Sequence, residues 1–242
     1  MNIHKNKPLS FRHENKYLID ASNAEILRSR LATLLRRDEH TGEGGIYKIR
    51  SLYFDDYWNS AYEEKFMGVS KRFKYRIRVY NDSDDIIRLE RKLKREAYIA
   101  KQSAPLTRDE TERLMDGDYD FLRDSPHILC KEFYYECVTR YMRPRVIVDY
   151  DREPFVYEAG DVRITFDMNL RASTLRYDIF DENLPSIHVM DPGHIILEVK
   201  FTEFIPGFLR EMLPHRVGSM ESLSKYTMVC DRLAHLSVNP SY

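Results

Sequence analysis

The feature that most constrains the fold of this chain is an alternation of charged and apolar side chains with a period of two residues. It is clearest in residues 74–94, KYRIRVYNDSDDIIRLERKLK, where two strand-length segments flank an acidic turn at 81–85. Because successive side chains of a strand point to opposite sides, Arg76 and Arg78 share a face of the first strand, and Lys92 lies on the charged face of the second. The stretch therefore predicts a β-hairpin with one cationic face.

The same alternation recurs along the chain. It predicts strands at 11–19, 46–54, 162–170 and 194–201, and the β-branched run at 144–156 predicts a buried strand that ends in a turn at Glu153-Pro154. A single charged strand face normally faces water. Here amphipathic helices are expected to cover the apolar faces of the sheet, so the charged faces lie on the side away from the helices. If the sheet closes, these faces point inward. The expected fold is α+β, a closed antiparallel β-barrel of about eight strands with helices packed on the outside.

Helices are expected between these strands. A capping box at Ser22 and Glu25 predicts a helix to Arg37, and a second box at Thr107 and Glu110 predicts another. Further helices are expected from Asp55-Asp56 to Met67, including Trp58, and at 125–141 and 219–236. No internal repeat or linker interrupts the pattern, so we expect one domain over residues 1–242, with its core at about 9–236.

An interior lined with Arg and Lys is energetically costly unless anions neutralise it. Residues 71–101 hold eleven Lys and Arg against five Asp and Glu, a local charge of +6, whereas the whole chain has a net charge of −1. This asymmetry favours a local anion site over a protein that coats nucleic acid. About eight strands leave room for one small ligand. A string of phosphates is the expected occupant.

No membrane span or secretion signal is expected. No apolar run approaches the roughly 20 residues of a span, and the start, MNIHKNKPLS, lacks the apolar core of a signal peptide. Cys130, Cys137 and Cys230 form no CxxC pair, which favours reduced thiols and a cytoplasmic location. The eight histidines show no HExxH or paired spacing, so none is assigned to a metal.

Eight short motifs, taken in order, resemble those of a known family. They are R-x-E-x-K-Y (12–17), Y-x-x-R-S-L-Y-F-D (47–55), K-Y-R-I-R-x-Y (74–80), L-E-R-K (89–92), Y-D-R-E-P-F (150–155), V-R-I-T-F-D (162–167), I-L-E-V-K (196–200) and S-K-Y (224–226). The series resembles the VTC-type polyphosphate polymerase domain, the catalytic part of the vacuolar transporter chaperone complex, which belongs to the triphosphate tunnel metalloenzymes. The resemblance implies a tunnel-shaped barrel that uses a divalent metal, Mn²⁺ or Mg²⁺, to transfer the γ-phosphate of ATP to a growing inorganic polyphosphate chain.

The resemblance also implies the roles of individual residues. It places phosphate ligands at Lys16, Arg76, Arg78, Lys92, Arg152, Arg163, Lys200 and Lys225, with Ser224 as a further contact to the nucleotide. Glu198 is the first expected metal ligand, with Glu14 and Glu90 as lesser candidates. These residue types suit phosphoryl transfer, in which positioning and neutralisation of the phosphate oxygens dominate.

One position departs from the related tunnel hydrolases. These typically open with E-x-E-x-K, whereas this chain has Arg12 in place of the first carboxylate. Loss of a group that could bind metal or orient water favours the polymerase, whose nucleophile, a terminal phosphate, is already ionised at pH 7. A tripolyphosphatase or nucleoside triphosphatase on the same barrel and a non-catalytic polyphosphate-binding module remain as alternatives.

Partners follow from the same resemblance. ATP and inorganic polyphosphate or triphosphate are the expected ligands, and no nucleic acid is expected. The sequence lacks the SPX-type sensor and the membrane helices of the eukaryotic complex, so a free-standing soluble enzyme is expected. A separate membrane partner and the oligomeric state are left open.

Overall fold

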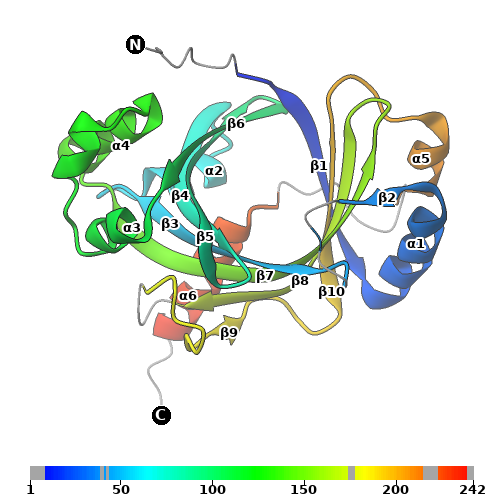
Figure 1. Ribbon diagram of the computed structural model, residues 1–242. Helices are drawn as coiled ribbons and strands as arrows, with labels where there is room; N and C mark the ends of the chain where they lie inside the picture. Colours follow the sequence, from blue (N-terminus) through cyan, green and yellow to red (C-terminus); the bar gives the residue numbers. More distant parts are fainter. Residues whose placement is uncertain (1–8, 39–40, 42–43, 174–177, 215–222, 239–242) are drawn as a thin grey trace.

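The structure, a computed structural model, describes residues 9–38, 41, 44–173, 178–214 and 223–238. Its main feature is a sheet that closes on itself (Figure 1). The closed part consists of β1 (Arg12–Asp20), β3 (Tyr47–Asp55), β4 (Lys71–Tyr80), β5 (Ser83–Arg95), β6 (Tyr98–Leu106), β7 (Arg143–Tyr157), β8 (Val162–Ser173) and β10 (His194–Phe201). These strands pair antiparallel in the order β7-β3-β4-β5-β6-β1-β10-β8, and β8 pairs back with β7. The prediction of an α+β fold around a closed sheet of about eight strands is confirmed.

Two short strands extend the ring. β2 (Arg36–Arg37) pairs with β7, and β9 (Ile187–His188) pairs with β8. The ring is least extensively paired between β1 and β6, where only Arg12 with Ile99 and His13 with Tyr98 are in register.

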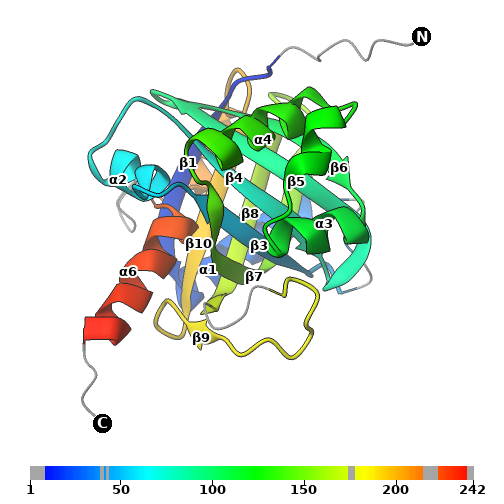
Figure 2. The same cartoon turned by 90° about the vertical axis from the view of Figure 1, so that its left-hand side faces the viewer.

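Helices cover the outside of the ring (Figure 1). α3 (Arg108–Met115), a short 3-10 helix (Asp120–Asp124) and α4 (Ile128–Thr139) lie on one side, and α1 (Ala21–Leu34) and α5 (Gly207–Met212) on the other. α2 (Ser60–Phe66) lies beside α6 (Lys225–Val238) (Figure 2). Burial of apolar side chains, such as Phe133 against Phe54 and Tyr75, holds α4 on the outward faces of the strands.

The inward-pointing side chains divide the ring interior into an apolar and a charged part. Ile49, Val148 and Ile196 form an apolar cluster with Tyr226 and Val229 of α6. On each of these strands, the residues two and four positions after the apolar residue point to the same side of the sheet as it does. Most of them are polar or charged. α6 therefore packs on the apolar part and brings its first residues beside the charged part.

The ends of α1 differ from those expected. The helix begins at Ala21 because Asp20 caps it, with Oδ1 accepting the backbone N–H of Asn23 at 2.8 Å. The predicted capping box at Ser22 and Glu25 is therefore wrong. The helix also ends before the residues of β2, because these pair with β7 instead of continuing the helix.

The start of α2 is partly as expected. Trp58 was predicted inside the helix, but α2 begins only at Ser60. The N-cap residue is Asn59, which forms no side-chain cap hydrogen bond, but the two aspartates still satisfy the first turn: Asp56 accepts the N–H of Ser60 at 2.8 Å and Asp55 accepts that of Ala61 at 2.9 Å.

The remaining helices follow the predictions more closely. In α3 the capping box is confirmed, with Thr107 accepting the N–H of Glu110 at 3.1 Å and Glu110 accepting that of Thr107 at 2.8 Å. α4 is shorter than the expected 125–141. The expected start of the last helix, 219–222, lies outside the described residues, and α6 is assigned from Lys225. Among the helices that the structure describes, none combines the length and apolar character needed to cross a membrane.

Two turns also differ. The hairpin of 74–94 reverses over Asn81 and Asp82 alone, whose φ angles are 52° and 56°, so the rest of the expected turn belongs to β5. β7 continues through the expected turn at Glu153-Pro154, where Pro154 lies opposite Thr165. Proline lacks only its own N–H, and the pairing of its neighbours with β8 outweighs the local turn signal.

Candidate functional site

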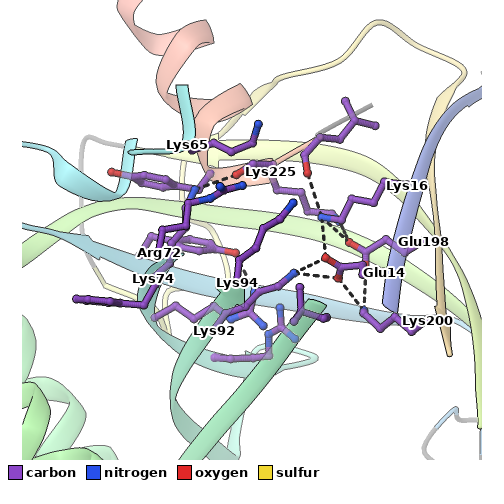
Figure 3. A pocket seen from close by; sticks show the side chains of 18 of the residues that line it. Glu14, Lys16, Lys65, Arg72, Lys74, Lys92, Lys94, Glu198, Lys200 and Lys225 are labelled. Carbon is purple, nitrogen blue, oxygen red and sulfur yellow. Dashed lines mark hydrogen bonds and ion pairs between the residues drawn. The ribbon is translucent and has the colours of Figure 1, made fainter. Parts of the chain in front are cut away.

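A cavity of about 150 Å³ lies within the charged part of the ring interior (Figure 3). Side chains from β1, β3, β4, β5, β6, β7, β10 and α2, and from the start of α6, line it. Eleven of the lining residues are Lys or Arg, and only two are carboxylates. Such an excess of positive charge inside a closed sheet indicates a highly charged anion as the ligand.

Most of the site residues expected from the sequence meet in this cavity. The ten that line it are Glu14, Lys16, Arg76, Arg78, Lys92, Arg152, Glu198, Lys200, Ser224 and Lys225. They come from segments far apart in sequence, which the closure of the ring brings together. Their roles in binding phosphate or metal stay predictions.

Two expected site residues do not line the cavity. The guanidinium of Arg163 lies 2.7 Å from the carboxylate of Asp38 and donates to the hydroxyl of Tyr47 at 3.1 Å. Glu90 has no exposed surface and accepts hydrogen bonds from Arg76, at 2.7 Å, and from Lys101, at 2.6 Å. Both groups thus already have charged partners.

Four cations of the cavity were not among the expected site residues: Lys65, Arg72, Lys74 and Lys94. Three of them could have been found from strand phase, because Arg72 and Lys74 precede Arg76 at intervals of two and Lys94 follows Lys92. Lys65 lies on α2, and no sequence pattern indicates that this helix borders the cavity.

Glu198 lies at the centre of the cationic groups. Its Oε1 is 2.9 Å from Nζ of Lys225 and 3.2 Å from Nζ of Lys16. Its Oε2 is 2.7 Å from Nζ of Lys200 and 3.2 Å from the guanidinium of Arg152. Burial alone would raise the pKa of Glu198, but these cations outweigh it and hold the pKa well below its usual value. The surrounding cations therefore favour the ionised form of Glu198.

Glu14 is the second carboxylate of the cavity. Lys92 donates to its two oxygens at 2.7 and 2.9 Å, and Lys200 lies 3.6 Å away. In the register of β1 with β10, Glu14 lies opposite Lys200 and Lys16 lies opposite Glu198, so charges alternate across the pair of strands. Despite burial, the ammonium groups of Lys16 and Lys92 lower the pKa of Glu14 below its usual value.

Two tyrosine hydroxyls support the arginines of β4. Arg76 binds Glu90 through two N–H groups and donates to the hydroxyl of Tyr53 at 2.8 Å. Arg78 donates to the hydroxyl of Tyr150 at 3.0 Å. Because each phenolic oxygen accepts from an arginine, its own proton is free to donate to a ligand in the cavity. Burial would raise the pKa of Tyr53, but the two arginines lower it below its usual value.

Contacts to β3, β7 and β8 hold the start of α6. Lys225 contacts the carboxylate of Asp167, which also forms a two-pronged ion pair with Arg152 at 2.6 and 2.7 Å. Although burial opposes it, the carboxylates around Lys225 raise its pKa above the usual value. The next residue, Tyr226, donates from its hydroxyl to Oδ2 of Asp55 at 2.6 Å. These contacts fix the Lys225 ammonium inside the ring.

Lys74 has no such carboxylate partner among the described residues. Its Nζ donates to Oγ of Ser224 at 3.0 Å and lies 4.7 Å from the ring centroid of Tyr226. Burial, together with the charge of Arg72, lowers the pKa of Lys74 to about 7. Burial also lowers the pKa of Lys92 to about 7, against the opposing effect of Glu14.

Comparison with known proteins identifies the family. Residues 11–234 match the family model described as the VTC domain. The chain belongs to the VTC-domain family. The predicted resemblance is thereby confirmed, while a search of curated proteins found no match.

A solved structure shares the fold of this VTC domain, and a second aligns over a similar length. A candidate adenylyl cyclase from Hippeastrum, described as having a dominant triphosphatase activity, aligns with a TM-score of 0.50 and 13% identity over 91% of this chain and 95% of its own. A candidate adenylate cyclase from Bacillus halodurans aligns with a TM-score of 0.49 and 15% identity over 87% of this chain and 96% of its own.

Two carboxylates of this VTC domain suit a divalent metal that is bound together with phosphate. The described residues contain no group of three or more His, Cys, Asp or Glu side chains placed to hold a metal. Mg²⁺ is, however, commonly bound by one or two carboxylates plus phosphate oxygens of the substrate. Glu14 and Glu198, on neighbouring strands, offer two such carboxylates. They therefore suit a divalent cation that binds together with a phosphate chain, whereas Glu90 does not line the cavity.

Proposed function

We propose that this VTC domain is a metal-dependent polyphosphate polymerase that transfers the γ-phosphate of ATP to a growing inorganic polyphosphate chain inside the ring. The observation that carries the proposal is the cavity itself, which eleven cationic side chains and two carboxylates line. Phosphoryl transfer needs little from a protein beyond positioning and charge neutralisation, and this cavity offers both.

The cationic side chains would bind and orient the triphosphate of ATP. Arg76, Arg78 and Arg152 present planar guanidinium groups, which suit two-point binding of phosphate oxygens. Their hydrogen bonds to buried carboxylates and tyrosines hold them in place before substrate binds. Such preorganisation reduces the reorganisation needed in the transition state.

Glu14 and Glu198 would hold the divalent cation together with phosphate oxygens. When bound, the cation supplies neutralisation of the charge on the transferred phosphoryl group and the leaving group. Phosphate oxygens would draw the ammonium groups of Lys16 and Lys200 away from these carboxylates, leaving the carboxylates able to bind metal.

The pKa shifts favour transfer to phosphate over transfer to water. In the reaction, a terminal oxygen of the acceptor chain forms a bond to the γ-phosphorus, the bond from that phosphorus to the β,γ-bridging oxygen breaks, and ADP leaves. The acceptor oxygen is already ionised and needs no base. Glu14 and Glu198 have lowered pKa values and are weak bases, so they are poor candidates for removing a proton from water.

Hydrolysis of triphosphate is the second candidate function. It is favoured by the shared fold with the Hippeastrum protein that is described as having a dominant triphosphatase activity. Binding of polyphosphate without turnover is the third reading, since a cationic cavity alone would support it.

One product analysis separates these readings. The purified protein is incubated with ATP and Mn²⁺, the products are resolved by gel and phosphorus NMR, and free phosphate is assayed in parallel. Long chains formed with stoichiometric ADP and little free phosphate support the polymerase. Free phosphate without chains supports the hydrolase, and binding with neither product supports the binding module.

A further inference from the structure

α4, on the outside of the ring, has apolar side chains on two opposite faces. The face that packs on the ring holds four buried residues: Leu129, Cys130, Phe133 and Cys137. The opposite face carries an exposed stripe at intervals of three and four residues: Ile128, Lys131, Tyr135 and Val138. A helix that covers a sheet needs only one apolar face and usually keeps polar residues on the other. The exposed stripe is therefore a candidate interaction surface.

The exposed apolar surface continues beyond the end of α4. Tyr141 has a φ of 54°, a left-handed conformation that is unfavourable for a bulky side chain, yet the residue stays exposed. The backbone N–H of Tyr57 donates to the carbonyl of Arg140 at 3.2 Å, which places Tyr57 and Trp58 beside the same end of the helix. We call the whole surface the α4 patch: Tyr57, Trp58, Ile128, Tyr135, Val138 and Tyr141. α4 faces the viewer in Figure 2.

The α4 patch is large for the surface of a monomer. Its six members are between 46% and 75% exposed. An aromatic side chain has about 150–250 Å² of surface, so the patch exposes on the order of 600 Å², the upper end of the range for a typical monomer. Two copies of the patch therefore supply on the order of 1,200 Å², which reaches the size of a specific interface.

The stripe on α4 is complementary to itself. In two antiparallel copies of the helix related by a twofold axis near Phe133, residues equally far from this position on either side lie opposite each other. Ile128 and Val138 are each five positions from Phe133, and Lys131 and Tyr135 are each two positions from it. Ile128 thus faces Val138 of the second copy, an apolar contact. Lys131 faces the ring of Tyr135 of the second copy, a favourable cation–π contact.

The charges of the stripe favour a second copy over a membrane surface. Lys131 is followed by Glu132, a partly exposed carboxylate that Arg91 holds at 2.8 Å, so the stripe and its edge carry both signs of charge. Antiparallel packing brings Lys131 within one turn of Glu132 of the second copy, where opposite charges attract. A surface that binds an anionic bilayer instead surrounds its aromatic residues with Lys and Arg.

We propose that the α4 patch is the interface of a homodimer, in which two copies of α4 pack antiparallel across a twofold axis. Such a contact uses the same surface on both copies and closes at two chains. It lies on the face of α4 that points away from the ring, and it does not rest on the proposed polymerase activity.

Complementary charge variants test the interface and its orientation. Ile128→Glu and Val138→Lys each place a charge opposite an apolar side chain, so we expect either variant alone to raise the dimer dissociation constant about tenfold or more in sedimentation velocity. In a mixture of the two variants, the new carboxylate and ammonium lie opposite each other, while the other end of the interface keeps its native contact. The mixture should therefore form heterodimers more tightly than either variant forms dimers alone.

Matched controls are Ile26→Glu and Leu34→Lys on α1, at positions that are 54% and 49% exposed. Alone or mixed, they should leave the dimer unchanged. Because all four substitutions are at exposed positions, thermal denaturation should show each variant folded. The proposal is overturned if wild type remains monomeric up to about 100 μM, a concentration at which interfaces of this size associate. It is also overturned if Ile128→Glu and Val138→Lys dimerise as wild type does, or if their mixture gains nothing over the separate variants.

Discussion

The ammonium group of Lys225 lies 2.9 Å from Oε1 of Glu198, which ties the first residue of α6 to β10. The same carboxylate also contacts Lys16, Lys200 and Arg152. Four cations from β1, β7, β10 and α6 thus converge on one anion. The geometry makes Glu198 both a structural counter-charge and the best-placed candidate metal ligand.

Replacement of this carboxylate, Glu198→Gln, should abolish turnover while the protein still folds. Without the carboxylate, the four cations repel one another, and we expect the ligand-free protein to lose about 3 kcal/mol of stability. Tripolyphosphate should restore the negative charge and raise the melting temperature of the variant more than that of the wild type. Product assays and thermal denaturation with and without tripolyphosphate measure both effects.

The matched control for Glu198→Gln is Glu158→Gln, whose side chain is 91% exposed. It should change neither turnover nor melting temperature measurably. Turnover retained in Glu198→Gln would remove this residue from the metal site.

Truncation of the cavity arginine, Arg76→Ala, should weaken triphosphate binding by more than about tenfold, because the guanidinium proposed to bind phosphate is lost. Arg76→Lys keeps the charge but not the two-pronged geometry, so an intermediate affinity is expected. Calorimetric titration with tripolyphosphate provides the measurement, with Arg123→Ala, at a 63% exposed surface position, as control. An unchanged affinity in Arg76→Ala would contradict its assignment to the phosphate site.

Strand phase explains why much of the cavity could be predicted from the sequence. A strand has only two faces, and a shift of one residue would bury charges in the outer apolar cores. Arg76 and Arg78 therefore had to point away from Tyr75 and Ile77, and closure of the sheet turned that face inward.

Long-range placement explains what could not be predicted. Arg163 has the phase of a cavity residue, but Asp38 and Tyr47, which approach through tertiary folding, hold it elsewhere. Lys65 borders the cavity only because α2 packs between β4 and α6. Local propensity likewise predicted a turn at Pro154, where pairing with β8 continues the strand. Such contacts depend on the three-dimensional neighbours of a residue, which periodicity does not encode.

The hydrogen bond that links α6 to β3 can be tested by Tyr226→Phe. This change removes one hydroxyl, which donates to buried Asp55 at 2.6 Å, and keeps the ring that stacks on Tyr53. We expect a loss of about 1.5–3 kcal/mol in stability and a several-fold weaker affinity for tripolyphosphate, because Lys225 is less firmly placed. Thermal denaturation and calorimetry measure the two effects.

A second hydroxyl–carboxylate contact, between α2 and α6, provides the control. The Tyr62 hydroxyl on α2 donates to Asp231 on α6, but this contact is exposed to solvent. Tyr62→Phe should therefore change stability and affinity much less. Equal effects in the two variants would show that the Asp55 contact does not position the cavity residues.

Lys74 should make phosphate binding depend on pH. Its pKa in the free protein is lowered to about 7, so above that pH the amine is increasingly neutral. A bound phosphate stabilises the ammonium form and raises this pKa, so binding near pH 8 should take up protons and weaken as the pH rises. Calorimetry in two buffers of different ionisation enthalpy measures the uptake. Lys74→Arg keeps the charge without titrating in this range and should lower the uptake, with Lys92, whose pKa is also lowered to about 7, supplying the remainder.

The lowered pKa of Lys74 affects stability in the opposite direction to phosphate affinity. Because the folded pKa of Lys74 lies below the unfolded value of 10.5, the unfolded state binds more protons between these two pH values. The contribution of Lys74 to the free energy of unfolding should therefore rise with pH from about 7 to about 10, even as phosphate affinity falls. Denaturant unfolding across this range, compared between wild type and Lys74→Met, isolates the contribution. A difference between the two proteins that stays constant with pH would contradict a lowered pKa and, with it, the view that Lys74 is buried without a carboxylate partner among the described residues.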